Sequence, residues 1–320
     1  MVRYIIRRLL WVVVLLFFVS FLTFIIFYTL PSADPALLRA GRQPNPELVE
    51  QIRHNLGLDQ PWYQQYFDYM KQLVLHFDLG YSFQNNYPVK DQIFNRLPAS
   101  ISVAIGAAVI WLLLGISIGV ISAVRSRTAL DRVTMGLALV AISAPVYWLG
   151  LVALYLFSND IGRFHVFMGA GTYVPFSQDP WLWFGSLIMP WFVLAAAFAA
   201  FYARLVRGSM IETMSEDYIR TARAKGLVER RIVVRHALKN ALVPIVTVIG
   251  VQAGYLLGGA VLTETVFAWP GVGTLMVQGI LARDIPLVQG CVLVVALTFV
   301  LVNLFVDLLY AWLDPRIRYE

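Results

Sequence analysis

The 320-residue sequence has few cysteines, few histidines and little charge. It contains one cysteine, Cys291, and four scattered histidines. One cysteine excludes an internal disulfide and a cysteine metal cluster, and the histidines lack metal-ligand spacing. Only 14% of the residues are charged, against about 25% in soluble domains. This composition excludes an ordinary cytosolic enzyme, a disordered chain and a nucleic-acid-binding module.

Enzyme motifs are also missing. No glycine is followed by lysine, so the chain has no phosphate-binding loop of the G-x-x-x-x-G-K type. The metalloprotease pattern H-E-x-x-H does not occur either. We therefore expect no catalytic residues, no metal site and no cofactor bound by this chain, which is not an enzyme by itself.

What the sequence has instead is long apolar runs, with 59% hydrophobic residues. A membrane-spanning helix needs about 20 mostly apolar residues. Six runs qualify, which predicts an all-α integral membrane protein with six transmembrane helices. They are about Leu9–Leu30, Ala99–Val124, Val133–Phe157, Trp183–Leu205, Leu242–Thr263 and Leu287–Leu313. The first run is too long for a signal peptide and lacks an A-x-A-like site before Pro31, so we interpret it as an uncleaved anchor.

The basic residues predict the orientation of these helices, because Lys and Arg concentrate in cytoplasmic loops. With the N-terminus inside, 17 of the 25 Lys and Arg residues fall on the inner side. Six of the other eight lie in one long segment, where the rule is weak because long segments translocate regardless of charge. We expect both termini in the cytoplasm.

The predicted organisation has four parts. Residues 1–30 form the anchor helix, 31–98 an external helical segment between helices 1 and 2, 99–313 a five-helix core, and 314–320 a cytoplasmic tail. In the external segment, Asn45-Pro46 is a helix-start signal and Gly57 a stop. After Pro61, aromatic and apolar residues recur at helical spacing, so this segment is too ordered for a bare loop.

The one long inner loop covers about residues 206–241. A helix is predicted to begin near Ser215, with Glu216 and Asp217 in its first turn. Gly226 follows its basic last turn and predicts a left-handed stop. A second helix from Glu229 to about Asn240 leads into the fifth run. The loop thus presents a helix, a glycine turn and a second helix, all strongly basic.

This loop resembles that of the inner-membrane permeases of ABC importers. Their general signature matches at Ala222, Gly226 and Leu238 but departs at four positions, namely Arg220, Thr221, His236 and Lys239. The peptide-type branch is much more similar, through Tyr218–Leu227 and Arg235–Leu242. Further similar stretches are Gly57–Pro61, Asp78–Phe83, Arg96–Ser100, Thr263–Gly273 and Asp314–Arg318. The likeness is to the B-type subunit of dipeptide/oligopeptide (peptide/nickel) permeases.

The resemblance implies a type I ABC importer permease fold in the plasma (inner) membrane, surrounded by lipid. It implies a heterodimer with a second homologous permease, two cytoplasmic ATPase subunits that hold ATP and Mg, and an external solute-binding protein. Nucleic acid is not an expected partner. It also implies that the loop docks on one ATPase subunit through Tyr218, Arg220, Thr221, Ala222, Arg223, Ala224, Lys225 and Gly226. The alternative is a solvated basic loop that only enforces orientation.

Candidates for the solute path lie on the fifth run. Gly250, Gly254 and Gly258 are spaced four apart, with Gln252 as a polar neighbour and Glu264 at the outer end. Such a face either lines a path or simply packs closely on another helix. Glu264 either contacts a cationic solute group or braces the turn at residues 267–273. Gly115 and Gly119, in the second run, are interpreted as packing residues only.

Two other classes of function stay open. An acidic residue at membrane depth is a candidate functional site. A stand-alone proton-coupled secondary carrier would therefore use Glu264 or Asp307. A membrane scaffold without a transport role is the third possibility. The residues do not identify the solute; peptide is favoured over glutathione, nickel complexes, haem or oligosaccharides only because peptide systems prevail among similar proteins.

Overall fold

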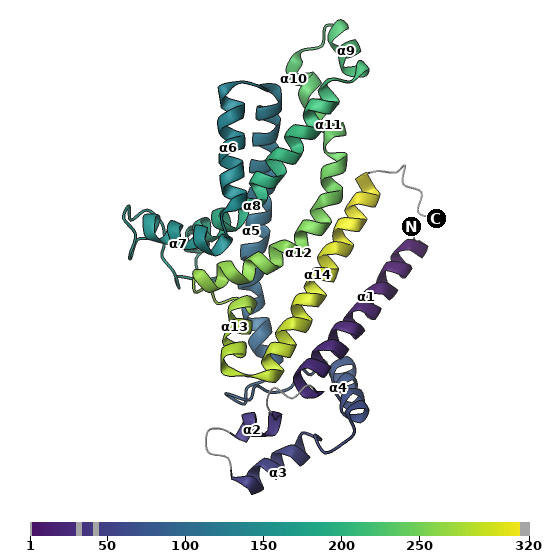
Figure 1. The fold of residues 1–320 in the computed structure, drawn as a ribbon, viewed down its shortest axis with the longest axis vertical. Coiled ribbons are helices and arrows are strands. Elements are labelled where there is room, and N and C mark those ends of the chain that lie inside the picture. Colours follow the sequence, from purple (N-terminus) through teal and green to yellow (C-terminus); the bar gives the residue numbers. More distant parts are fainter. Residues whose placement is uncertain (1, 30–33, 41–44, 314–320) are drawn as a thin grey trace. The chain divides into compact units, whose positions relative to one another are not determined.

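The computed structural model describes residues 2–29, 34–40 and 45–313. Side chains of residues 2–5, 243, 244, 246, 247, 250, 251, 253, 257 and 307–313 lie outside this description. The elements are helices, and the described part contains no strand. Their order is α1 Val2–Phe24, η1 Ile25–Thr29, α2 Pro35–Ala40, α3 Pro46–Asn55, α4 Trp62–His76, α5 Val89–Val124, α6 Ala129–Ser143, α7 Val146–Phe157, α8 Pro180–Met214, α9 Asp217–Ala224, α10 Glu229–Arg231, η2 Ile232–Ala237, α11 Leu238–Ala241, α12 Val243–Val266, α13 Val272–Ala282 and α14 Ile285–Leu313 (Figure 1).

The prediction of an all-helical membrane protein is confirmed. Four of the described helical stretches are long and apolar enough to cross a membrane, namely Ile6–Thr29, Val89–Val124, Pro180–Met214 and Ile285–Val306. A fifth candidate is the bent pair of α6 and α7. The predicted fifth run forms α12, several of whose side chains lie outside the description. The number six therefore stays a prediction.

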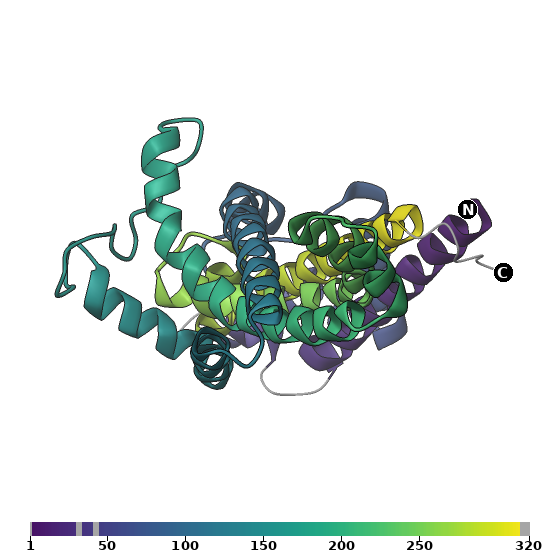
Figure 2. The same ribbon diagram turned by 90° about the horizontal axis from the view of Figure 1, so that it is seen from above.

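The third apolar run, predicted as one helix from Val133 to Phe157, is instead two helices. The chain turns by 107° between α6 and α7. Pro145 has no backbone N–H and disfavours a helical conformation at the residue before it. Ala144 is accordingly extended, with φ −83° and ψ 127°. Figure 2 shows α6 almost end-on while α7 is seen from the side.

Two other helices are longer than their apolar runs. Helix α5 begins at Val89, ten residues before the predicted start, and passes through Pro98. Helix α8 begins with the Asp179 cap and continues to Met214, so the inner loop, expected from about Val206, starts later than predicted. Hydropathy marks the apolar part of a helix, and a helix extends beyond it wherever polar residues also favour helical conformations.

The chain packs as two units, which are defined by contacts. Unit 1 contains the described residues before Ala99 and Gly271–Leu304; unit 2 contains Ala99–Pro270 and the described residues after Leu304. The four predicted parts of the chain were defined by their position relative to the membrane, whereas these two units are defined by contacts. The predicted boundaries therefore stay predictions.

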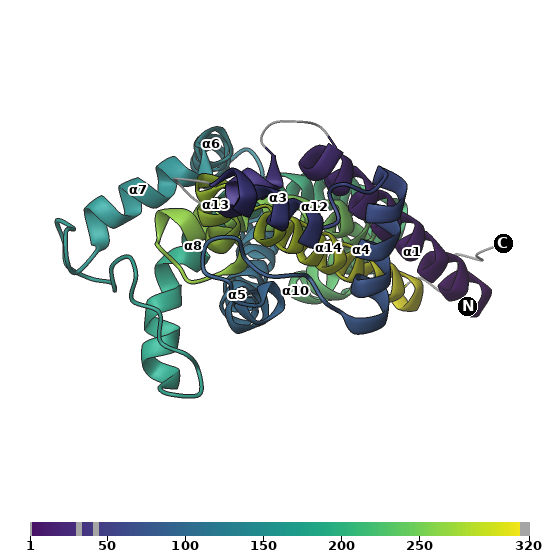
Figure 3. The ribbon, with the colours of Figure 1, turned by 90° about the horizontal axis from the view of Figure 1, so that it is seen from below.

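In unit 1, helix α4 crosses α1 and contacts it through side chains (Figure 3). Tyr66 packs edge-on against Phe21, with ring centroids 5.2 Å apart, and its hydroxyl lies 2.9 Å from that of Ser20. The α3 start signal is confirmed, since the Asn45 side chain accepts from the Glu47 amide and Pro46 follows it. The predicted stop is also confirmed, because Gly57 has φ +65°.

A buried carboxylate ties the segment before α5 to the segment before α14. Asp284 accepts hydrogen bonds from the Ser82 hydroxyl and, at 3.1 Å, from the Phe83 amide. Beside it, Val89 and Ile93 pack against Leu287 and Cys291 in the core of unit 1. Unit 1 is thus a helical assembly with its own core, built from residues nearly 200 positions apart.

In unit 2, α5 and α8 approach closely because glycines face the contact. A Cβ on Gly115 would lie 2.7 Å from the Tyr202 Cβ, and one on Gly119 would lie 2.7 Å from the Ala203 carbonyl oxygen. This confirms the packing interpretation of these two glycines. Nearby, Trp111 stacks on Tyr202, with ring centroids 5.5 Å apart. Helix α8 then leads into the inner loop.

Candidate functional site: the inner helical hairpin

Residues 215–241, here called the inner hairpin, are ordered as predicted. Helix α9 begins at Asp217, in agreement with the acidic first-turn signal. It ends in a complete Schellman motif, in which the Gly226 amide donates to the Arg223 carbonyl (2.9 Å) and the Leu227 amide to the Ala222 carbonyl (3.3 Å). Gly226 has φ +75°, which confirms the predicted left-handed stop.

The inner hairpin has its own apolar contact. Ile219 and Ala222, one turn apart on α9, are buried in the core of unit 2 together with Ile232 and Ala237 of the second helix. That second helix is continuous through α10, η2 and α11, as predicted from Glu229 to Asn240. Asn240 donates to the Tyr218 hydroxyl at 2.7 Å. The two arms therefore hold each other in a fixed arrangement.

An ion pair joins the two arms of the inner hairpin at its turn. Arg223 donates through Nη2 and Nε to the two carboxylate oxygens of Glu229, at 2.7 and 3.2 Å. This hydrogen-bonded pairing lowers the pKa of Glu229 below its ordinary 4.5 and raises that of Arg223. Arg220 pairs with Asp217 at 3.2 Å on the same helix. Both pairs are exposed, so they fix side-chain positions more than they stabilise the fold.

The predicted coupling residues divide into two groups. Seven are exposed, namely Tyr218, Arg220, Thr221, Arg223, Ala224, Lys225 and Gly226. Ala222 instead faces the core, where its small side chain allows α9 to pack on the second helix. A Cβ on Gly226 would meet no atom within 4 Å, so the glycine is required there by its backbone conformation alone. The exposed group forms a basic face on an otherwise self-contained hairpin.

The sequence patterns did not indicate an ion pair between α6 and α8 of unit 2. Arg207 on α8 donates to both carboxylate oxygens of Asp131 on α6, at 2.6 and 2.8 Å. Ser122 on α5 and the Arg127 amide complete the carboxylate's contacts. Figure 1 shows the α5–α6 turn and the hairpin at the same end of unit 2. The available signal was an acidic residue at the inner end of one apolar run and an arginine at the inner end of another.

The candidates for a solute path all lie on α12. Gly250 belongs to α12, but its burial lies outside the description, as does the side chain of Asp307. Gln252 and Gly254 are half-buried, and Gly258 is exposed with no atom within 4 Å of an added Cβ. The Glu264 side chain is buried. The backbone carbonyl of Glu264 accepts a hydrogen bond from the Trp269 amide at 2.7 Å. The backbone of Glu264 thus braces the following turn, while the path itself stays a prediction.

The described residues offer no group of three His, Cys, Asp or Glu side chains placed to hold a metal ion. The inner hairpin combines a capped helix, an exposed face with several Lys and Arg residues, and an apolar contact between its arms.

Comparison with known proteins covers the whole chain. Residues 115–319 match the family described as binding-protein-dependent transport system inner membrane component, and residues 1–104 match the N-terminal part of such membrane components. A putative peptide transport system permease protein of Brucella abortus is 44% identical over the full length of both chains. A dipeptide transport system permease protein of Alkalihalophilus pseudofirmus is 39% identical, and a glutathione transport system permease protein of Escherichia coli 41%, again over both full lengths.

Proposed function

Since the chain belongs to the binding-protein-dependent transport system inner membrane components, in the peptide/nickel family of ABC importer permeases, we propose that it is the B-type permease subunit of an ATP-driven peptide importer. The relatives named as peptide and dipeptide permeases support a peptide-class solute. The glutathione permease supports the same chemistry, because glutathione is itself a short peptide.

The proposed arrangement has six spans with both termini in the cytoplasm, in a type I importer fold. The chain pairs with a second homologous permease, and an external binding protein delivers the solute. Two ATPase subunits carry ATP and Mg. One chain supplies one inner hairpin, whereas a clamp of two ATPases needs two docking points, so a pseudo-twofold heterodimer follows.

The observation that carries the proposal is the rigid inner hairpin with its exposed basic face. Arg220 stands on a helix, and Lys225 directly follows it; the other side of this helix is anchored by Ile219 and Ala222 in the core of unit 2. A force applied to this helix therefore moves the core of unit 2 as well. A merely solvated loop would not need a buried contact between its arms.

Gly226→Asp tests this role. Its φ of +75° imposes about 1–2 kcal/mol of backbone strain on a residue with a Cβ. The open space around Gly226 adds no clash, so the subunit should still insert. At the docking face, however, the new carboxylate adds a negative charge and a larger side chain to a surface that is otherwise basic. We expect normal abundance in the membrane but loss of ATPase association and of uptake.

Gly226→Ala carries the same backbone strain without the charge, so it should retain more uptake. Arg127→Glu, in the α5–α6 turn, controls for a general loss of positive charge at this end of unit 2. Full uptake by the Gly226→Asp variant would remove the coupling role. Loss of that variant from the membrane would make the position structural.

The rival is a stand-alone proton-coupled carrier, favoured by the buried carboxylate of Glu264. Transport assays in reconstituted vesicles distinguish the importer from the carrier. The importer predicts no peptide uptake by the purified chain alone under a proton gradient, and uptake with ATP once the second permease, the ATPases and the binding protein are added. Gradient-driven uptake by the chain alone, abolished by Glu264→Gln, would establish the carrier.

A further inference from the structure

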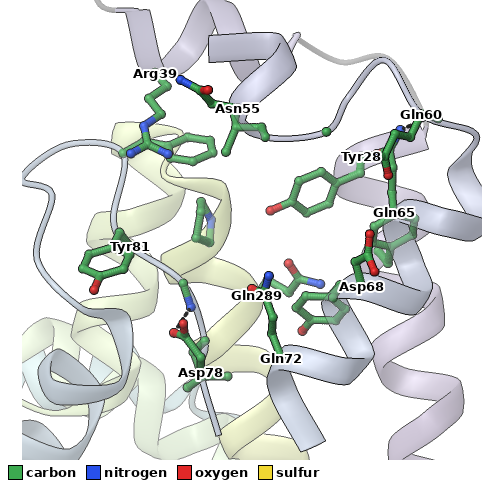
Figure 4. A pocket seen from close by; sticks show the side chains of 18 of the residues that line it. Tyr28, Arg39, Asn55, Gln60, Gln65, Asp68, Gln72, Asp78, Tyr81 and Gln289 are labelled. Carbon is green, nitrogen blue, oxygen red and sulfur yellow. Dashed lines mark hydrogen bonds between the residues drawn. The ribbon is translucent and has the colours of Figure 1, made fainter. Parts of the chain in front are cut away.

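Unit 1 contains a polar cavity that the proposed coupling role does not use. Its volume is about 450 Å³, within the size range of small-molecule sites. Its walls are formed by the ends of α1, η1 and α3, by α2 and α4, by the connection between α3 and α4, by the stretch before α5 and by the start of α14. Most of the side chains labelled in Figure 4 are amides, carboxylates or tyrosines.

Two buried polar atoms in the cavity wall have no hydrogen-bond partner among the described residues. They are the Tyr69 hydroxyl and Nε2 of Gln289. Gln289 is only 2% exposed and points into the cavity in Figure 4. Burial raises the pKa of Tyr69, so its hydroxyl stays protonated and is available as a donor. Buried polar groups normally have partners, so these two indicate a polar ligand.

The charged groups lie on opposite walls. Arg39 stands on one side of the cavity and Asp68 on the other, with Gln289 between them (Figure 4). The Arg39 guanidinium lies 5.8 Å from the centre of the Phe83 ring, and no described carboxylate forms an ion pair with it. Asp78, the other carboxylate in the wall, already accepts from the Gly80 amide at 2.8 Å. A cation and a carboxylate separated by amide groups complement a zwitterion.

We propose that this cavity binds a short zwitterionic peptide. Arg39 holds the peptide's carboxylate, Asp68 its ammonium group, and Gln289 with Tyr69 the carbonyl of the peptide bond between them. An arginine fork is the side chain best suited to a carboxylate. The arrangement of Arg39 and Asp68 indicates a zwitterion independently of the proposed function. The choice of a peptide over other zwitterions rests on the proposed function. The cavity would make the permease itself, and not only a binding protein, selective for its solute.

The test is binding of dialanine to the purified full-length chain in lipid nanodiscs, by calorimetry. N-acetyl-dialanine lacks the ammonium group, and dialanine amide lacks the carboxylate. Arg39→Gln should weaken dialanine binding by about tenfold or more, as expected for one charge-assisted contact, but leave binding of the amide unchanged. Asp68→Asn should weaken dialanine equally but leave the acetylated peptide unchanged. Lys71→Gln, on α4 but outside the cavity, and Asp91→Asn, at the start of α5, are matched controls.

Thermal unfolding of each variant checks that it is folded. Selective loss of the matching contact in both variants supports the site. Absent dialanine binding, or equal weakening by the two controls, overturns it, as does tighter binding of free alanine than of dialanine. Because no ATPase is present, these results are independent of ATPase association: the cavity can fail while the coupling role holds, and the reverse.

Discussion

Arg207 on α8 holds Asp131 on α6 through two hydrogen bonds, across 76 positions of the sequence. The Asp131 side chain is 4% exposed and also accepts from Ser122 on α5. Three helices of unit 2 therefore meet at one carboxylate, directly where the chain turns from α5 into α6. In the proposed importer, this carboxylate fixes α8, the helix that leads into the inner hairpin, against α5 and α6.

Asp131→Asn should destabilise the protein more than any loss of charge on the inner hairpin. The substitution leaves the partly buried Arg207 without its counter-ion, which costs about 3 kcal/mol, the lower end of the range for breaking a buried pair. Thermal unfolding in detergent measures the loss. Asp217→Asn is the matched control, because that side chain is 94% exposed and its variant should unfold at the wild-type temperature. Equal unfolding temperatures for both variants would refute the structural importance of the pair.

Two glycines with opposite surroundings test the close approach of α5 and α8. Gly119→Ala would place its Cβ 2.6 Å from that of Val206, and such overpacking costs about 1–3 kcal/mol. Gly136→Ala on α6 meets no atom within 4 Å and gains up to about 1 kcal/mol of helix propensity. The unfolding temperature should fall for the first and be unchanged or rise for the second. The opposite order would mean that α5 and α8 are not in contact at Gly119.

The Arg223–Glu229 pair gives the inner hairpin a defined pH dependence. The pKa of Glu229 is lowered in the folded chain, so its contribution is fully present above the ordinary value of 4.5 and is lost as pH falls through the lowered value. Between pH 7 and 5, the pair should therefore be unaffected. Glu229→Gln should release Arg223 and speed tryptic cleavage after Arg223 and Lys225 at pH 7.5. Glu212→Gln, outside the pair, should leave the cleavage rate unchanged; equal acceleration by both would assign the effect to lost charge.

Reporter fusions test the proposed orientation. A reporter after Arg127 or at Glu229 should read as cytoplasmic, and one near Asn85 as external. The basic residues around the first two positions support this assignment. An internal signal at Asn85 would invert the topology and remove the inner hairpin from the side where ATP is available.

Features set by neighbouring residues were predictable from the sequence, and those set by distant pairs were not. The Asn45-Pro46 cap and the Gly226 stop depend on local backbone chemistry, and both are present. The bend at Pro145 is also local, but the span prediction rested on apolar length alone, which the two helices share. Asp131 and Arg207, or Tyr69 and Gln289, are brought together only by packing. No spacing rule reaches across such separations, so the buried ion pair and the cavity required the structure.

Site-directed cross-linking of the inner hairpin tests the coupling role most directly. The chain's one cysteine, Cys291, is fully buried, so an introduced cysteine would be the accessible thiol. Thr221→Cys and Lys225→Cys place it on the exposed face of the inner hairpin, and Asn85→Cys places it on the side assigned to the exterior. With a short photo-activatable thiol reagent in the assembled complex, the first two should yield a product of this chain joined to the ATPase subunit. Asn85→Cys and the wild type should yield none. Absence of that product at both inner-hairpin positions, in a complex that still co-purifies with its ATPase, would contradict the coupling role.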